Sequence, residues 1–105
     1  MIYTIITTSN SVEVLKKIAK ILIDERLSPC AQISQEIESM YLWDNKIEKN
    51  KEFLLTIKTV KSNIDEINII ISDNHNYEVP EVIVNKTKII NNDYEDWFNQ
   101  NITRG

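Results

Sequence analysis

The chain has 105 residues, of which 42% are hydrophobic and 27% are charged, a composition typical of one soluble globular domain spanning residues 1–105. Its 16 acidic and 12 basic residues give a net charge of −4, which argues against the basic surface of a nucleic-acid-binding protein. A single cysteine excludes an internal disulfide, and no apolar run reaches the roughly 20 residues needed to cross a membrane. We therefore expect a cytoplasmic protein with neither nucleic-acid nor membrane partners.

The N-terminal part predicts a strand followed by a helix. Residues 2–8 are a β-branched run typical of a buried strand. The sequence Asn10-Ser11-Val12-Glu13 then resembles a helix N-cap, and apolar side chains recur at helical spacing after it. Because Pro29 disfavours helical geometry in the residue before it, we expect this helix to end near Arg26 or Leu27.

A long hairpin is predicted next. Apolar and polar residues alternate over residues 30–43, which predicts a strand with one buried face. A second run extends from Ile47 to Thr59, and Asp44-Asn45 between the runs favours a hairpin turn. Both strands exceed the usual 5–6 residues, so the hairpin should project beyond the globule.

The remaining residues predict a helix, a strand and a terminal helix. Ser62 is the expected N-cap of the second helix, whose buried stripe should comprise Ile64, Ile67, Ile70 and Ile71. The last strand starts at Val82 and is expected to extend to Ile90. A short terminal helix capped by residues 91–93 carries Tyr94, Trp97 and Phe98.

The predicted order of elements is β-α-β-β-α-β plus a C-terminal helix, which belongs to the α+β class. Two β-α-β halves joined by a hairpin are typical of the ferredoxin-like arrangement, with an antiparallel sheet and both helices on one face. The other sheet face then lacks a cover within the monomer, and the projecting strands have open edges. We therefore expect a homo-oligomer with closed symmetry.

The segment at residues 75–81, between the second helix and the last strand, holds the only histidine. His75 is either a locally hydrogen-bonded loop residue or a metal ligand or proton shuttle, and imidazole suits copper, zinc and nickel. A closed zinc site within one chain is excluded, because no second histidine or cysteine has ligand spacing. Glu78 and Glu81 either ligate a cation or are solvated loop acids.

Five further residues are candidates for a ligand cleft, each with a structural alternative. Cys30 is either a buried structural thiol or the nucleophile of a Cys-His pair. Tyr41, Trp43 and Trp97 are packing groups, although the first two lie beside the hairpin tip and suit an interface. Lys58 either points to water or binds an anion in a cleft. Without a phosphate-binding glycine loop or a nucleophile elbow, we expect no enzyme.

Five motifs in order and spacing resemble the CutA divalent-cation tolerance proteins over nearly the whole chain. These motifs are residues 26–31 (RLSPCA), 39–43 (SMYLW), 54–59 (LLTIKT), 75–82 (HNYEVPEV) and 94–97 (YEDW). The resemblance implies a ferredoxin-like subunit in a tight homotrimer, with the long hairpins pairing between subunits. It also implies a cytoplasmic protein linked to tolerance of copper and other divalent cations. The family looks like the PII signalling proteins in architecture, which suggests binding or signalling rather than turnover.

Three positions depart from the family pattern. Asn76 stands where the family usually has proline, so we expect a less rigid loop before Tyr77, and Asn45 stands where a glycine is usual. Thr7 or Thr8 matches a first-strand cysteine that has been proposed as a copper ligand in some bacterial members. A hydroxyl replaces a soft thiolate poorly, so a copper site here should be weaker or built differently around His75.

Two functions are therefore expected, in this order. The first is weak binding of Cu(II) or another divalent cation, with His75 as principal ligand and Glu78 or Glu81 as oxygen donors. The second is a PII-like signalling module that binds a small anionic metabolite in an intersubunit cleft formed by Lys58, Tyr77, Glu78 and Trp43. An enzyme that uses Cys30 or His75 ranks last.

Overall fold

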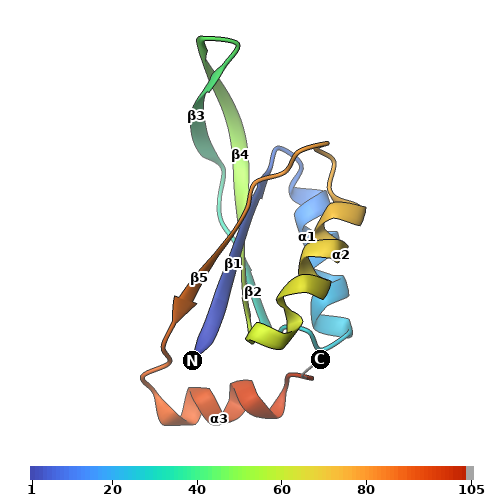
Figure 1. Ribbon diagram of the computed structural model, residues 1–105, viewed down its shortest axis with the longest axis vertical. Coiled ribbons are helices and arrows are strands. Elements are labelled where there is room, and N and C mark those ends of the chain that lie inside the picture. The colour runs from blue at the N-terminus through green and yellow to red at the C-terminus, as the bar shows by residue number, and fades with distance from the viewer. Residues whose placement is uncertain (104–105) are drawn as a thin grey trace.

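A computed structural model describes residues 1–103 of the chain and shows an α+β protein, as the sequence predicts (Figure 1). A five-stranded antiparallel sheet is combined with three helices and one short 3-10 turn. The elements in chain order are β1 (Ile2–Ser9), α1 (Val12–Asp24), β2 (Cys30–Ile33), β3 (Ile37–Trp43), β4 (Lys46–Thr59), η1 (Lys61–Asn63), α2 (Ile64–Asn74), β5 (Val82–Thr87) and α3 (Asn92–Gln100).

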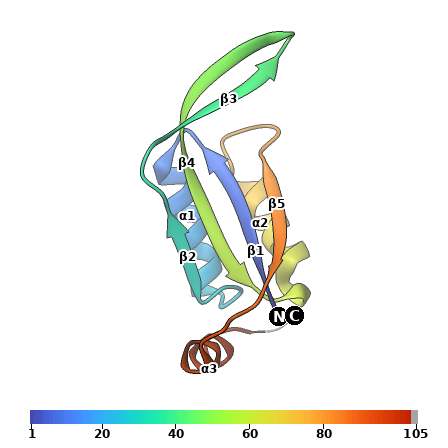
Figure 2. The ribbon, with the colours of Figure 1, turned by 90° about the vertical axis from the view of Figure 1, so that its left-hand side faces the viewer.

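The strand order in the sheet is β2-β4-β1-β5, and β3 pairs with the distal part of β4. The central strand β1 is antiparallel to both neighbours, with Ile5 opposite Ile57 of β4 and Val84 of β5. Helices α1 and α2 cover one face of the sheet, and Figure 2 views the other face, which neither helix covers. Helix α3 lies across the end of the sheet that is remote from the hairpin tip.

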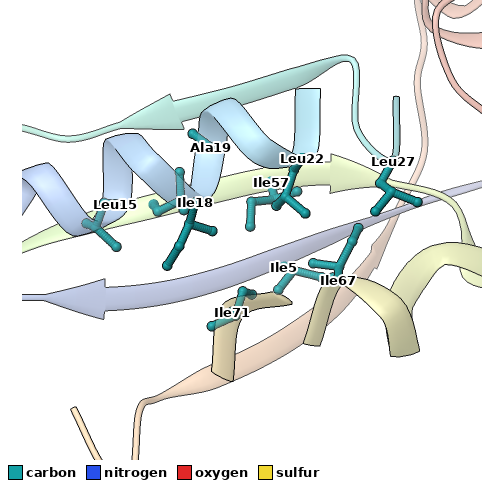
Figure 3. Packing of buried hydrophobic residues seen from close by; sticks show 10 residues of the cluster. Ile5, Leu15, Ile18, Ala19, Leu22, Leu27, Ile57, Ile67 and Ile71 are labelled. Carbon is teal, nitrogen blue, oxygen red and sulfur yellow. The ribbon is translucent and has the colours of Figure 1, made fainter. Parts of the chain in front are cut away.

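The main core lies between the sheet and the two helices, and Figure 3 shows its side chains meeting from both layers. Alternate residues of β1 and β4 face the helices, and a helical stripe on each helix faces the sheet. The fully buried members are Ile5, Leu15, Ile18, Leu22, Leu55, Ile57, Ile67 and Ile71. The predicted stripe of α2 is confirmed, with Ile64 and Ile70 partly buried at its margin.

The hairpin of β3 and β4 extends past the sheet as an arm, and its turn is where the sequence places it. Asp44 and Asn45 have φ values of 55° and 62°, the two positive values that a type I′ hairpin turn requires. The arm explains a radius of gyration of 14.6 Å, against about 13 Å for a compact domain of this length.

Two predictions about the hairpin are wrong for the single chain. The strand expected over residues 30–43 is interrupted between β2 and β3, where Ser34 Oγ accepts a hydrogen bond from the Leu54 amide at 2.8 Å. Instead of one buried face, the arm is exposed on both sides, with 75% of Leu42 and 68% of Trp43 accessible to solvent. Residues 1–103 provide no second layer of structure that could bury the arm (Figure 1).

Three predicted element ends also differ. The first helix is capped by Ser11, which accepts from the Val14 amide, and it ends at Asp24, before Arg26 adopts a φ of 57°. Ser62 lies inside η1 and does not cap α2. The N-cap position belongs to Asn63, whose Nδ2 atom donates to the carbonyl groups of Leu27 and Thr103 at 3.2 and 2.6 Å.

The last strand ends at Thr87 instead of Ile90, because the chain turns away from the sheet to form a second small core. Ile89 packs there against the cluster of Ile2, Val60 and Phe98. Asn91 caps α3 as predicted, accepting from the Tyr94 amide at 2.9 Å. None of the helices within residues 1–103 is long and apolar enough to span a membrane.

Candidate functional site

The loop between α2 and β5 carries the only histidine and lies beside the end of β1. The backbone leaves α2 at His75, which adopts an extended conformation and ends the helix. Its imidazole Nε2 lies 2.9 Å from the Thr8 carbonyl oxygen, and its Nδ1 accepts the Tyr77 amide at 3.0 Å. A carbonyl can only accept and an amide can only donate, so the two partners fix the neutral tautomer with its proton on Nε2.

Both nitrogens of His75 are therefore occupied by the backbone. Burial lowers the pKa of His75, while its hydrogen bond to Thr8 and the charge of Glu52 act in the opposite direction. The imidazole holds the loop against β1 and orients Tyr77, whose ring centroid lies 5.0 Å from its own. A metal ion could bind His75 only after one of these hydrogen bonds breaks.

Asn76 ties the same loop to the junction of β1 and α1. Its Oδ1 atom accepts from Ser9 Oγ at 2.5 Å, and its Nδ2 atom donates to Asn10 Oδ1 at 2.8 Å. The family that the sequence motifs resemble usually has proline at this position, so Asn76 predicts a less rigid loop. The two side-chain hydrogen bonds of Asn76 nevertheless anchor the loop here.

Tyr77 connects the loop to a buried carboxylate on β4. Its hydroxyl donates to Glu52 Oε2 at 2.6 Å and accepts from the Asn10 amide at 2.9 Å. Burial, followed by the hydrogen bond to Glu52, raises the pKa of Tyr77 to about 12. Glu52 itself is only 7% exposed. It pairs with Ile37 at the base of the arm, where β4 leaves the sheet.

One wall of a cavity of about 750 Å³ contains Asn10, Glu52 and Tyr77, and we call this cavity the hairpin groove. It lies between the arm, the end of β1 and the loop after α2. Its aromatic lining is Tyr41, Trp43 and Tyr77, its acidic lining is Glu48, Glu52 and Glu81, and its other lining residues are Thr8, Asn10, Ser39, Met40, Asn50 and Val79. Among residues 1–103, no lysine or arginine belongs to this lining, so the charge of the groove favours cations.

The structure divides the predicted site residues into two groups. Tyr41, Trp43, Tyr77 and Glu81 line the hairpin groove, and His75 supports it from behind through Tyr77. Glu78 is an exposed residue of the same loop and does not line the groove.

The second group lies at the end of the sheet beside α3. Cys30 and Lys58 are paired across β2 and β4, and the Lys58 ammonium lies 5.8 Å from the centroid of the Tyr94 ring. Burial and the adjacent Cys30 thiol raise the pKa of Tyr94. Cys30 is half-buried and unbridged. The ring centroids of Trp97 and Tyr94 lie 5.5 Å apart. Trp97 also lines a separate cavity together with Arg26 and Pro29.

Cys30 is not near His75, so the structure does not support a Cys-His pair. Cys30 pairs with Lys58 towards the α3 end of the sheet, whereas His75 is held at Thr8 near the hairpin end of β1. Lys58 and Trp43 likewise lie in separate cavities of the single chain.

The sequence analysis did not predict three residues at these sites as site residues: Glu52, Asn10 and Tyr94. Glu52 directly precedes the apolar run of β4, and an acid beside a buried strand segment was the one available signal. Asn10 and Tyr94 have no such signal, because their roles depend on which loop and which strand pack beside them.

Within residues 1–103, no group of three or more histidine, cysteine, aspartate or glutamate side chains could hold a metal ion. His75, Glu78 and Glu81 therefore do not form a complete metal site within residues 1–103 of one chain. Their role as metal ligands stays a prediction.

Residues 3–101 match the family model described as CutA1 divalent ion tolerance protein. The chain is 40% identical over 89 residues to Protein CutA 1, chloroplastic, of Oryza sativa, covering 85% of this chain and 50% of that protein. It is 32% identical over 97 residues to the divalent-cation tolerance protein CutA of Thermus thermophilus, covering 92% of this chain and 94% of that protein. The chain thus spans about half the length of the rice relative and nearly all of the bacterial one.

A solved structure agrees with these sequence matches. The crystal structure of CutA1 from Oryza sativa superimposes with a TM-score of 0.92 at 34% identity, covering 99% of this chain and 95% of that one.

Proposed function

Because the chain belongs to the CutA1 divalent ion tolerance family, we propose that it acts in the response to divalent cations, copper among them, and binds these ions weakly. The observation that carries this proposal is the hairpin groove, where Glu48, Glu52 and Glu81 line a cavity to which residues 1–103 contribute no basic side chain. Carboxylate oxygens are ligands for hard divalent cations, and copper(II) also accepts oxygen donors.

Weak binding follows from the donor set. Three carboxylates that do not converge leave most coordination positions to water, and His75 would have to give up a backbone hydrogen bond to contribute a nitrogen. We therefore place the principal contribution on the groove carboxylates and keep His75 and Glu78 as secondary donors.

Calorimetry with Cu(II) tests this proposal and separates the two donor sets. We expect Glu81→Gln to weaken binding several-fold, and His75→Ala to change it less. Glu13→Gln is the matched control, because Glu13 is an exposed residue of α1 and is not among the groove residues. Equal isotherms for the wild type, Glu81→Gln and His75→Ala would refute both donor sets.

We further propose that the subunit is ferredoxin-like and forms a homotrimer in the cytoplasm. The uncovered sheet face and the exposed apolar residues of the arm, including Leu42 and Trp43, support association. Light scattering should give three times the chain mass of 12.3 kDa, and a monomer mass would refute the assembly. Fluorescent tagging tests the proposed cytoplasmic location. The test is needed because the rice relative is named chloroplastic.

A specific observation supports the PII-like alternative. A cavity of about 350 Å³ beside α3 is lined by Lys58, Lys88 and Tyr94, and the described part of the chain adds no acidic residue to its lining. Its charge therefore suits a small anion. A thermal-shift screen with phosphate and nucleotides tests this binding site, and Lys58→Gln should abolish any shift. A shift that survives Lys58→Gln would assign the ligand elsewhere. Under either proposal we expect binding without catalysis.

A further inference from the structure

The cavity beside Trp97 lies away from the arm, at the junction of α1 and α3, and we call it the helix-junction cavity. Its volume is about 270 Å³, and its lining residues are Ile23, Asp24, Arg26, Pro29, Trp97 and Asn101. Within residues 1–103, neither the arm nor any strand of the sheet contributes to this lining. In Figure 1 the C-terminal part of α3 lies below the helices, away from the uncovered sheet face. Association through that face and the arm therefore leaves this cavity accessible.

Arg26 occupies a backbone position that does not favour arginine. Its amide donates to the Ile23 carbonyl at 3.0 Å. The next amide, of Leu27, donates to the Leu22 carbonyl at 3.0 Å, and the two bonds together form the Schellman motif that ends α1. Arg26 takes the left-handed position of this motif, with a φ of 57°, where glycine is usual and asparagine is tolerated. The hairpin turn has Asn45 in that backbone region, so backbone preference does not account for an arginine here.

The Arg26 guanidinium gives the helix-junction cavity its charge. Neither ion pair within residues 1–103 involves Arg26. Asp24 is the acidic residue of the described lining, and its Oδ2 atom lies 2.7 Å from Lys20 Nζ. Because Lys20 offsets the charge of Asp24, the guanidinium leaves the cavity with a positive charge that attracts anions.

The rest of the lining is largely apolar and aromatic. Trp97 and Ile23 are each 42% exposed, and Pro29 completes the apolar part. A planar carboxylate pairs with a guanidinium group through two parallel hydrogen bonds, and an aromatic ring packs favourably against an indole. The volume of about 270 Å³ is just below the usual range for small-molecule sites, so it suits a ligand with a single ring.

We propose that the helix-junction cavity binds a small aromatic carboxylate, with the carboxylate group at the Arg26 guanidinium and the ring against Trp97. The interaction needs no metal ion. The cavity is separate from the hairpin groove and from the cavity that Lys58 lines, so this site goes beyond both functions proposed above.

Titration with benzoate, followed through the indole N–H signals in NMR spectra, tests the proposal. The chain has two tryptophans, and the signal that disappears in Trp97→Phe is assigned to Trp97. Benzyl alcohol and benzylammonium carry the same ring with no charge and with a positive charge. We expect a saturable shift of the Trp97 signal with benzoate alone, with a Kd of about 1–10 mM for so small a ligand.

Arg26→Gly separates ligand binding from a structural role of Arg26, which is its interaction with the dipole of α1. Glycine is the residue that the positive φ favours, so the denaturation midpoint should not fall, whereas the Kd for benzoate should rise at least five-fold. Arg26→Lys keeps the charge without the two-pronged geometry, so it should raise the Kd less. Lys17→Ala on the exposed side of α1 is the matched control and should leave the Kd unchanged.

An unchanged Kd in Arg26→Gly, or equal binding of benzyl alcohol, would overturn the proposal. Arg26 is exposed, so Arg26→Gln decides the same question if the glycine variant fails to fold. Lys58→Gln should retain benzoate binding; binding that is lost in Lys58→Gln and kept in Arg26→Gly would place the ligand in the other cavity and overturn this inference alone.

Discussion

The Tyr77 hydroxyl donates a 2.6 Å hydrogen bond to Glu52 Oε2, and this contact joins the loop after α2 to the base of the hairpin arm. Glu52 pairs with Ile37 in the arm, while the next residue, Phe53, pairs with Ser9 of β1. The bond therefore sits where β4 passes from the sheet into the arm. This hydrogen bond holds the loop after α2 against the base of the arm, and both segments line the hairpin groove.

Replacing Tyr77 with phenylalanine should lower the free energy of unfolding by about 1–2 kcal/mol, because the buried Glu52 carboxylate loses its donor. The same substitution in a Glu52→Gln background should cost less, which a double-mutant cycle measures. Denaturation is followed at constant protein concentration, since association contributes to stability. Tyr3→Phe is the control, and an effect of Tyr77→Phe that is identical in both backgrounds would contradict the coupling.

Two buried threonines should respond oppositely to the same substitution. Thr7 and Thr59 are both fully buried, but Thr7 Oγ1 has no hydrogen-bond partner within residues 1–103, whereas Thr59 Oγ1 donates to the Leu27 carbonyl at 2.7 Å. Thr7→Val should raise the free energy of unfolding by about 1 kcal/mol, and Thr59→Val should lower it by about 1–2 kcal/mol. Denaturant unfolding measures both, and equal losses would show that Thr7 is satisfied.

His75 gives a direct pH prediction, because it is the only histidine in the chain. Burial lowers the pKa of His75 below 6.5, so the folded state prefers the neutral ring. Below about pH 6.5 the unfolded chain binds the proton more readily, and stability should therefore fall as the pH drops through this range. NMR titration of the single imidazole measures the pKa and the Nε2-protonated tautomer.

The His75→Gln variant is the control for this titration, since it should lack the histidine contribution to acid destabilisation. A folded-state pKa above 6.5, or protonation of Nδ1 in the neutral ring, would contradict the hydrogen bonds with Thr8 and Tyr77.

Association through the arm should make the protein resistant to heat. If three subunits assemble, the melting temperature should exceed the 45–65 °C usual for mesophile domains and should rise with protein concentration. Leu42→Lys places a charge on the exposed arm, so it should lower both the melting temperature and the mass measured by light scattering. Lys17→Ala on the exposed side of α1 should change neither.

Local patterns were sufficient for most of the fold. The β-branched run of β1, the helical spacing in α1 and the Asp44-Asn45 turn each depend on neighbouring residues alone, and all three are confirmed. The errors occur where distant residues compete for the same backbone. Asn63 bonds to Leu27 and Thr103, so α2 starts after a 3-10 turn, and Ile89 joins Phe98 in a second core instead of continuing β5.

The sequence by itself determined the α+β class, the hairpin and the family motifs, because periodicity and turn chemistry act over a few positions. Tertiary structure decided the site. In the folded chain, both nitrogens of His75 are hydrogen-bonded to backbone groups. Glu52 is buried and bonded to Tyr77. Cys30 and Lys58 lie outside the hairpin groove. These outcomes depend on which segments meet across the sheet, and the charge, burial and hydrogen bonding of a side chain are set by those neighbours.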